Sequence, residues 1–188
     1  MHYHLSLNLL AMGDLDRALA HAERSCELGP WFTDSQFTHA VILYDLSRLD
    51  DARKVLLNLA DSEPSERAFH YLGLVEEKQG NLAQALRWYS LTLETDPGNT
   101  QTRFNLASLL TRQGRLREAA VQYGRILQDE PGHLKALLNL GHALALMGRP
   151  EDAGKIYEKA LEVEPGNPRA IRELEFLRQD ASRPRPPE

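Results

Sequence analysis

The apolar residues of this chain recur at helical spacings of three and four residues, and they do not alternate as in a half-buried strand. In one representative stretch, Leu106 and Leu110 mark the inner face of a first helix, and Ala119 and Tyr123 share one face of a second. Gly114 lies between them and can adopt the left-handed conformation that ends a helix. The pattern therefore predicts a helical hairpin.

The same hairpin recurs along the chain with a period of 34 residues, shortened once to 33. A proline ends each second helix, because proline cannot continue a helix. These prolines are Pro30, Pro64, Pro97, Pro131 and Pro165. The turn positions between the two helices are Gly13, Ser47, Gly80, Gly114 and Gly148. The prolines, the turn residues and the second-helix alanines described next all keep this period, and together they predict five repeats.

Small residues recur where the two helices of each hairpin should cross. The first helices carry Ser6, Ala40, Gly73, Ala107 and Gly141. The second helices carry Ala18, Ala52, Ala85, Ala119 and Ala153. Small side chains let two helix backbones approach closely, so we expect each hairpin to pack about this contact.

These letters resemble the tetratricopeptide repeat family. The best copy is 134–167, which carries Leu137, Leu140, Gly141, Ala153, Tyr157, Ala160 and Pro165 at the family's positions. The resemblance covers roughly residues 1–167. It implies an all-α fold, a right-handed α-solenoid of helix–turn–helix repeats, and an interaction module with no catalysis of its own.

We expect the following boundaries within the chain. The repeats span 1–32 (N-terminally incomplete, with Met1 inside the first helix), 33–65, 66–99, 100–133 and 134–167. An amphipathic capping helix over 168–180 follows, with a charged outer face that keeps the end of the array soluble. A Pro- and Arg-rich tail, 181–188, is predicted to be disordered.

Composition excludes several classes of function. The net charge is −5, against a basic nucleic-acid-binding domain, and no apolar stretch is long enough to insert in a membrane. Cys26 is the one cysteine, predicted to be an inert thiol, so a disulfide framework and a cysteine-rich zinc site are excluded. His2 and His4 should point apart on a helix, so we expect no metal site, no cofactor and no catalytic pair.

Functional candidates come from the resemblance, which implies that the first helices line a concave groove that binds a peptide or partner protein. Carried over by position, the groove candidates are Phe37, Tyr44, Arg67, His70, Lys78, Phe104, Asn105, Ser108, Arg112, Lys135, Asn139 and His142. The cations would receive carboxylates and the aromatic rings would receive apolar side chains. With Asp34 and Asp45 also at groove positions, the groove is expected to be acidic and aromatic at its N-terminal part and basic at its C-terminal part.

Asn105 and Asn139 occupy one repeat position and could bond the backbone of an extended peptide. This resembles the asparagine ladder of O-linked N-acetylglucosamine transferases, and an incidental role stays equally open. Asn105 and Lys135 match two positions of the family's chaperone-carboxylate clamp, but the other clamp positions do not match, so that function is not expected. Trp31 and Phe32 are expected to pack between repeats, or else to form an exposed contact patch.

Two alternatives to groove binding stay open. The N-terminal face has no preceding repeat to cover it, and Tyr3, Leu7 and Leu10 would make it a self-association surface that gives a homo-oligomer. The chain could also be a regulatory array from a larger enzyme or secretion component. We expect a cytoplasmic location, or a periplasmic one if the N-terminus is truncated. The excess of Arg over Lys, 17 to 5, is typical of a GC-rich bacterial genome.

Overall fold

The computed structural model describes residues 1–30 and 32–181, with side chains through Gln179. The described residues form eleven α-helices and contain no strand, which confirms the all-α repeat fold. The expectations for Trp31 and for the disorder of the 181–188 tail concern residues outside the described ranges or side chains, apart from the helical backbone of Ala181. The chain divides into two compact units, Met1–Asn99 and the residues from Thr100 onward.

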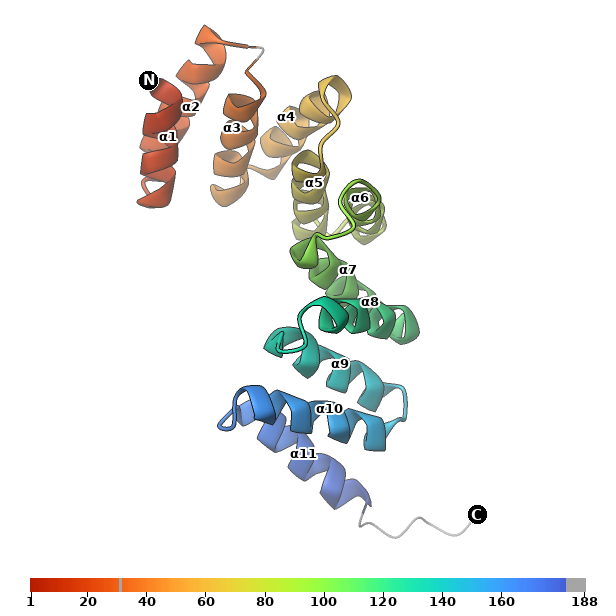
Figure 1. The fold of residues 1–188 in the computed structure, drawn as a ribbon. Helices are drawn as coiled ribbons and strands as arrows, with labels where there is room; N and C mark the ends of the chain where they lie inside the picture. Colours follow the sequence, from red (N-terminus) through yellow and green to blue (C-terminus); the bar gives the residue numbers. More distant parts are fainter. Residues whose placement is uncertain (31, 182–188) are drawn as a thin grey trace. The chain divides into compact units, whose positions relative to one another are not determined.

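Unit 1 consists of three helical hairpins (Figure 1). Its helices are α1 (His2–Ala11), α2 (Leu15–Leu28), α3 (Thr33–Asp45), α4 (Leu49–Ser62), α5 (Glu66–Lys78) and α6 (Leu82–Thr95). Each odd-numbered helix pairs with the next even-numbered one, and α2 packs on α3 and α4 on α5. The first helix begins at His2, with Met1 as its N-cap.

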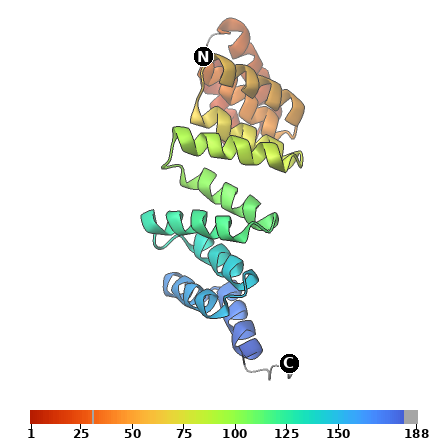
Figure 2. The same ribbon diagram turned by 90° about the vertical axis from the view of Figure 1, so that its right-hand side faces the viewer.

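Unit 2 contains two hairpins and a final helix, which can be followed by colour in Figure 2. Its helices are α7 (Thr100–Arg112), α8 (Leu116–Asp129), α9 (Leu134–Leu146), α10 (Pro150–Val163) and α11 (Pro168–Ala181). Helix α8 packs on α9, and α10 packs on α11. The odd-numbered helices from α1 to α9 are called first helices below, because they hold the first-helix positions of the five repeats.

The turns inside the hairpins adopt the left-handed conformation expected of them. The four glycines of this series have φ between +72° and +83°, and Ser47 takes the same conformation with φ +59°. A side chain in this region is strained because its Cβ crowds the following carbonyl oxygen. Ser47 therefore keeps a turn that its four counterparts make with glycine.

The small-residue crossings are buried as the spacing predicts. Ser6, Ala40 and Ala107 on the first helices, and all five alanines of the second helices, are essentially inaccessible to solvent. Gly141 lies directly against the ring of Tyr157, since a Cβ built on it would approach the ring carbons to 2.7 Å. Gly73 lies in the same way against Tyr89. The absent side chain is thus the space that the tyrosine ring fills.

Candidate interaction surface

The structure places all twelve groove candidates on first helices, and it divides them between the two units. Phe37, Tyr44, Arg67, His70 and Lys78 lie on α3 and α5 of unit 1. Phe104, Asn105, Ser108, Arg112, Lys135, Asn139 and His142 lie on α7 and α9 of unit 2. The first helices of neighbouring hairpins contact one another, α3 with α5 and α7 with α9. Each unit therefore carries its own first-helix surface.

The first-helix surface of unit 1 is built around an aromatic cluster. Tyr71 on α5 makes edge-to-face contacts with Phe37, at 5.2 Å between ring centroids, and with Tyr44, at 5.8 Å. His70 contacts the same ring at 5.7 Å. Burial lowers the pKa of His70, so its imidazole is neutral at neutral pH. Tyr71 was not among the candidates, although it holds the repeat position of Asn105 and Asn139.

Both cations of this surface are engaged inside the chain. The Arg67 guanidinium lies 4.0 Å above the Phe37 ring and 3.2 Å from an Asp34 carboxylate oxygen. Lys78 lies 4.7 Å above the Tyr44 ring and donates to the Ser47 hydroxyl at 3.1 Å. These contacts orient both cations on the surface. We call the two arrangements the cation latches.

One pocket lies beside the Arg67 latch, at the N-terminal ends of α3 and α5. It has a volume of about 220 Å³. Its lining residues are Thr33, Asp34, Phe37, Leu59, Glu63, Ser65, Glu66 and Arg67. Three of these residues, Asp34, Glu63 and Glu66, are acidic.

In unit 2, the two asparagines of the predicted ladder have partners within the chain. Asn105 accepts a hydrogen bond from Gln101 at 3.1 Å, and Asn139 accepts one from Arg169 of α11 at 2.9 Å. The side chains are thereby held in fixed orientations, and each asparagine keeps amide groups for a further partner. Burial raises the pKa of the nearby Tyr123 hydroxyl.

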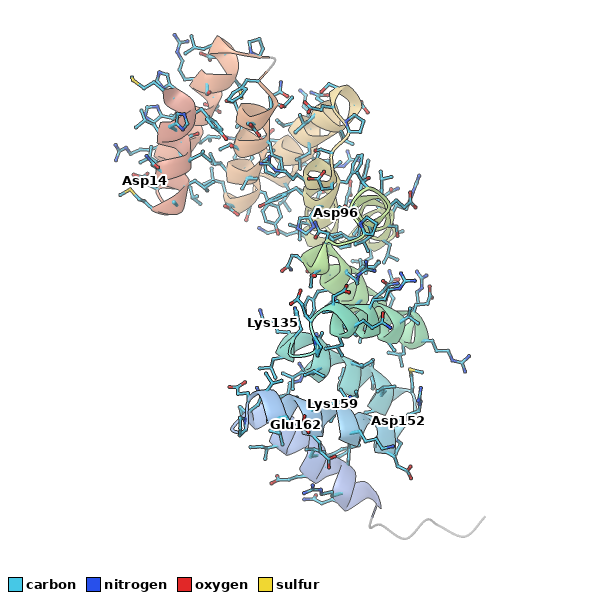
Figure 3. All side chains as sticks on the ribbon, viewed as in Figure 1. Asp14, Asp96, Lys135, Asp152, Lys159 and Glu162 are labelled. Atoms are coloured by element: carbon cyan, nitrogen blue, oxygen red, sulfur yellow. The ribbon has the colours of Figure 1, made fainter. Side chains whose placement is uncertain are left out.

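The remaining unit 2 candidates range from packed to exposed. Phe104 is half-buried between Tyr123, at 5.9 Å, and His133, at 5.8 Å. Ser108 and His142 are half-buried, whereas Arg112 and Lys135 are exposed. Lys135, labelled in Figure 3, extends from the first turn of α9. Tyr157, whose ring packs against Gly141 of α9, is fully buried, and burial raises its pKa to about 12.

The three residues predicted for self-association are not equally accessible. Leu7 is 36 % exposed. Tyr3 is half-buried with its ring 5.1 Å from that of Phe32, and Leu10 packs against a cluster that contains Leu9. Phe32 thus makes an intrachain contact and stays 42 % exposed. Leu5 on α1 is also exposed, as are Met1 and Met12, which cap the two ends of this helix.

Outside these surfaces, the described residues include a histidine pair and one free cysteine. His2 pairs with His21 at 2.8 Å between Nδ1 atoms, a contact between α1 and α2 that the spacing of His2 and His4 did not suggest. No group of three or more potential ligands for a metal occurs among the described residues. Burial and Glu23 raise the pKa of the Cys26 thiol, which disfavours the reactive thiolate. Along 1–30 and 32–181, every helix is too short or too polar to cross a bilayer.

Comparisons with known proteins agree with this architecture. Three family models described as tetratricopeptide repeat match residues 2–24, 37–100 and 110–174. No curated protein matches the chain in a sequence search.

Solved structures give the same picture. YrrB, described as a TPR protein with an unusual peptide-binding site, is 23 % identical, with a TM-score of 0.76 over 91 % of this chain and 89 % of YrrB. The C-terminal part of a TPR repeat-containing protein from Cytophaga hutchinsonii is 17 % identical, with a TM-score of 0.83 over 95 % of this chain and 72 % of that one. The first TPR of Spaghetti (RPAP3), bound to the HSP90 peptide SRMEEVD, is 27 % identical, with a TM-score of 0.59 over 63 % of this chain and 94 % of the other.

Proposed function

The chain belongs to the tetratricopeptide repeat family, and from that premise we propose that it binds a peptide or partner protein on its first-helix surfaces. As a member of this family it is a protein-interaction module. The chain then acts by binding alone, and the partner that it binds determines its biological role.

The observation that carries the proposal is the mixture of aromatic and cationic side chains on the first helices of unit 2. Phe104 is held half-buried by two ring contacts, and Arg112 and Lys135 extend into solvent. Aromatic residues and arginine are enriched at protein interfaces, where a ring provides apolar area and a cation pairs with a carboxylate. The peptide-binding site named for YrrB and the HSP90 peptide bound to the first TPR of Spaghetti (RPAP3) support the same proposal.

Such a surface would bind by presenting side chains that are already ordered. The asparagines and the half-buried ring are fixed by contacts within the unit, so little conformational freedom is lost on the array side. The ordering cost falls mainly on the ligand. An extended peptide could then use the remaining amide groups of Asn105 and Asn139 for backbone hydrogen bonds.

A display library of random peptides, selected against the full chain, tests the proposal. We expect the double variant Phe104→Ala with Arg112→Ala to bind the selected peptides about tenfold more weakly or worse, because it removes an aromatic anchor and a cation. The measurement is fluorescence anisotropy. The matched control is Arg117→Ala on α8, a second helix, which should leave affinity unchanged.

Thermal melting by circular dichroism verifies that each variant is folded, and Arg112→Ala alone avoids the packing role of Phe104. A selection that yields no peptide would contradict groove binding. If neither first-helix variant weakens binding of the selected peptides, the binding site lies on another surface.

Self-association is the second candidate, and the exposed apolar side chains of α1 favour it. Leu7, one of the residues predicted for self-association, is 36 % exposed. If it docks onto another copy, light scattering after size-exclusion chromatography should show a mass that grows with concentration. Leu7→Ser should then restore the 21.3 kDa monomer. A monomer at every concentration would contradict this candidate.

A further inference from the structure

The last helix carries more than the packing surface of a cap. Ala170 and Leu174 are buried, and α11 packs on α10. On another side, Phe176 is 61 % exposed, and the Arg172 side chain is 74 % exposed. An exposed phenylalanine next to an arginine is unusual for a face whose only task is to meet water.

The repeat register relates these residues to the candidates on α9. Arg169, Arg172 and Phe176 each follow a first-helix residue by one 34-residue period, namely Lys135, Leu138 and His142. Residues one period apart hold equivalent places on successive repeats. Helix α11 thus occupies the first-helix position of a further repeat, and its candidate side chains continue the rows of α7 and α9.

Contacts at the start of α11 hold this row against α9. Asn167 is nearly buried, and its side-chain oxygen accepts from the backbone of Ala170 at 3.1 Å and of Arg169 at 3.2 Å. Its amide donates to Glu164 at 2.7 Å. The Arg169 side chain then reaches across to Asn139 on α9 at 2.9 Å. The guanidinium is oriented by this neutral partner and retains donors for an anion.

The charge of the surface indicates which partner fits. Its cationic side chains on α9 and α11 are Lys135, Arg169 and Arg172, and Arg172 lies 3.8 Å from the carboxylate of Glu173. The exposed Arg112 on α7 belongs to the same unit. Together these cations favour a partner that carries carboxylates.

We infer that α11 completes the first-helix surface of unit 2, and that this surface takes a peptide segment with carboxylates beside a large apolar side chain. The inference rests on the proposed function, which it makes specific. Lys135, Arg169 and Arg172 receive the carboxylates, and Phe176 packs against the apolar side chain. The capping helix is then part of the binding site.

Two short fluorescein-labelled peptides test this chemistry on the full chain. In one, glutamates alternate with leucine and phenylalanine, and in the other lysines replace the glutamates. We expect the glutamate peptide to bind at least about tenfold more tightly, with affinity that falls as salt is raised. Arg172→Glu with Phe176→Ser should weaken it about tenfold or more. Arg178→Glu with Ile171→Ser, which changes charge and apolar area on the same helix outside this row, should bind as the unsubstituted chain does.

The outcomes separate this inference from the proposed function. If peptides from the random library depend on Phe104 and Arg112 but not on Arg172 and Phe176, the proposed function stands and the role of α11 is overturned. Equal or better binding of the lysine peptide, or no binding of the glutamate peptide, overturns the acidic partner. Equal loss in the Arg178→Glu control would show that only the fold of α11 matters, which also overturns the inference.

Discussion

Replacing Arg53 by alanine is expected to destabilise unit 1 by about 2–3 kcal/mol, because it strips a buried carboxylate of its ionic partner. Glu76 on α5 is 1 % exposed, and it receives hydrogen bonds from Arg53 at 2.6 Å and from Asn81 at 2.8 Å. Without the arginine, one carboxylate oxygen remains in the packed interior with no cation to balance its charge. The destabilisation is smaller than for a fully buried pair, because Asn81 still donates to Glu76 and the Arg53 side chain is half-exposed.

Replacing the other partner, Glu76, by leucine is expected to destabilise unit 1 far less. Leu110 and Leu144 hold the place of Glu76 in the next two repeats, so Glu76→Leu puts an apolar side chain where the fold already accepts one. Arg53, at 45 % side-chain exposure, can return its charge to water. Urea denaturation should therefore place Glu76→Leu within about 1 kcal/mol of the unsubstituted chain. Equal losses in the two variants would show that attraction within the pair, and not the isolated buried charge, dominates.

Gly73→Ala is expected to destabilise unit 1 by about 2 kcal/mol through overpacking. Its added methyl group would overlap the Tyr89 ring, which is fully buried and whose hydroxyl donates to Glu77 at 2.8 Å. A ring held at both its face and its hydroxyl cannot retreat without the loss of other contacts. Chemical denaturation of the full chain, followed by circular dichroism, measures the change in the free energy of unfolding.

Gly124→Ala on α8 is the matched control, since nothing lies within 4 Å of the Cβ that it adds. Alanine is preferred over glycine inside a helix, so this variant should be more stable by about 0.5–1 kcal/mol. The two substitutions are chemically identical and should differ in sign. A Gly73→Ala variant as stable as Gly124→Ala would mean that the hairpin widens at little cost.

The helices, turns and small-residue crossings could be predicted because each is a local property repeated five times. Gly114 and its counterparts have the positive φ that a helix end needs, and Ala119 and its counterparts are buried. Period and residue size were enough to place them. The boundaries expected for the individual repeats stay predictions at the level of residues, since helix ends vary by a residue or two.

The contacts on the candidate surface could be predicted less completely from the sequence. The cation latches join side chains on neighbouring helices, and periodicity gives the positions of Arg67 and Phe37 but not which of them touch. The pair of Arg53 and Glu76 was missed for the same reason. Arg172 and Phe176, which we infer to bind a partner, were not among the candidates although their spacing from α9 was visible, because the charged final helix was interpreted only as a solubilising cap.

The hairpins of each unit also bear on how the chain is made. The main contacts within each unit join helices that are adjacent in sequence or separated by one helix. Contacts between residues that are close in sequence lose little entropy on closure, and they form early and fast. The first hairpin can thus close while later residues are still being synthesised on the ribosome, and each newly emerged hairpin meets a folded template. The order of synthesis and the order of packing then coincide, which shortens the time that apolar helix faces stay exposed in the cell.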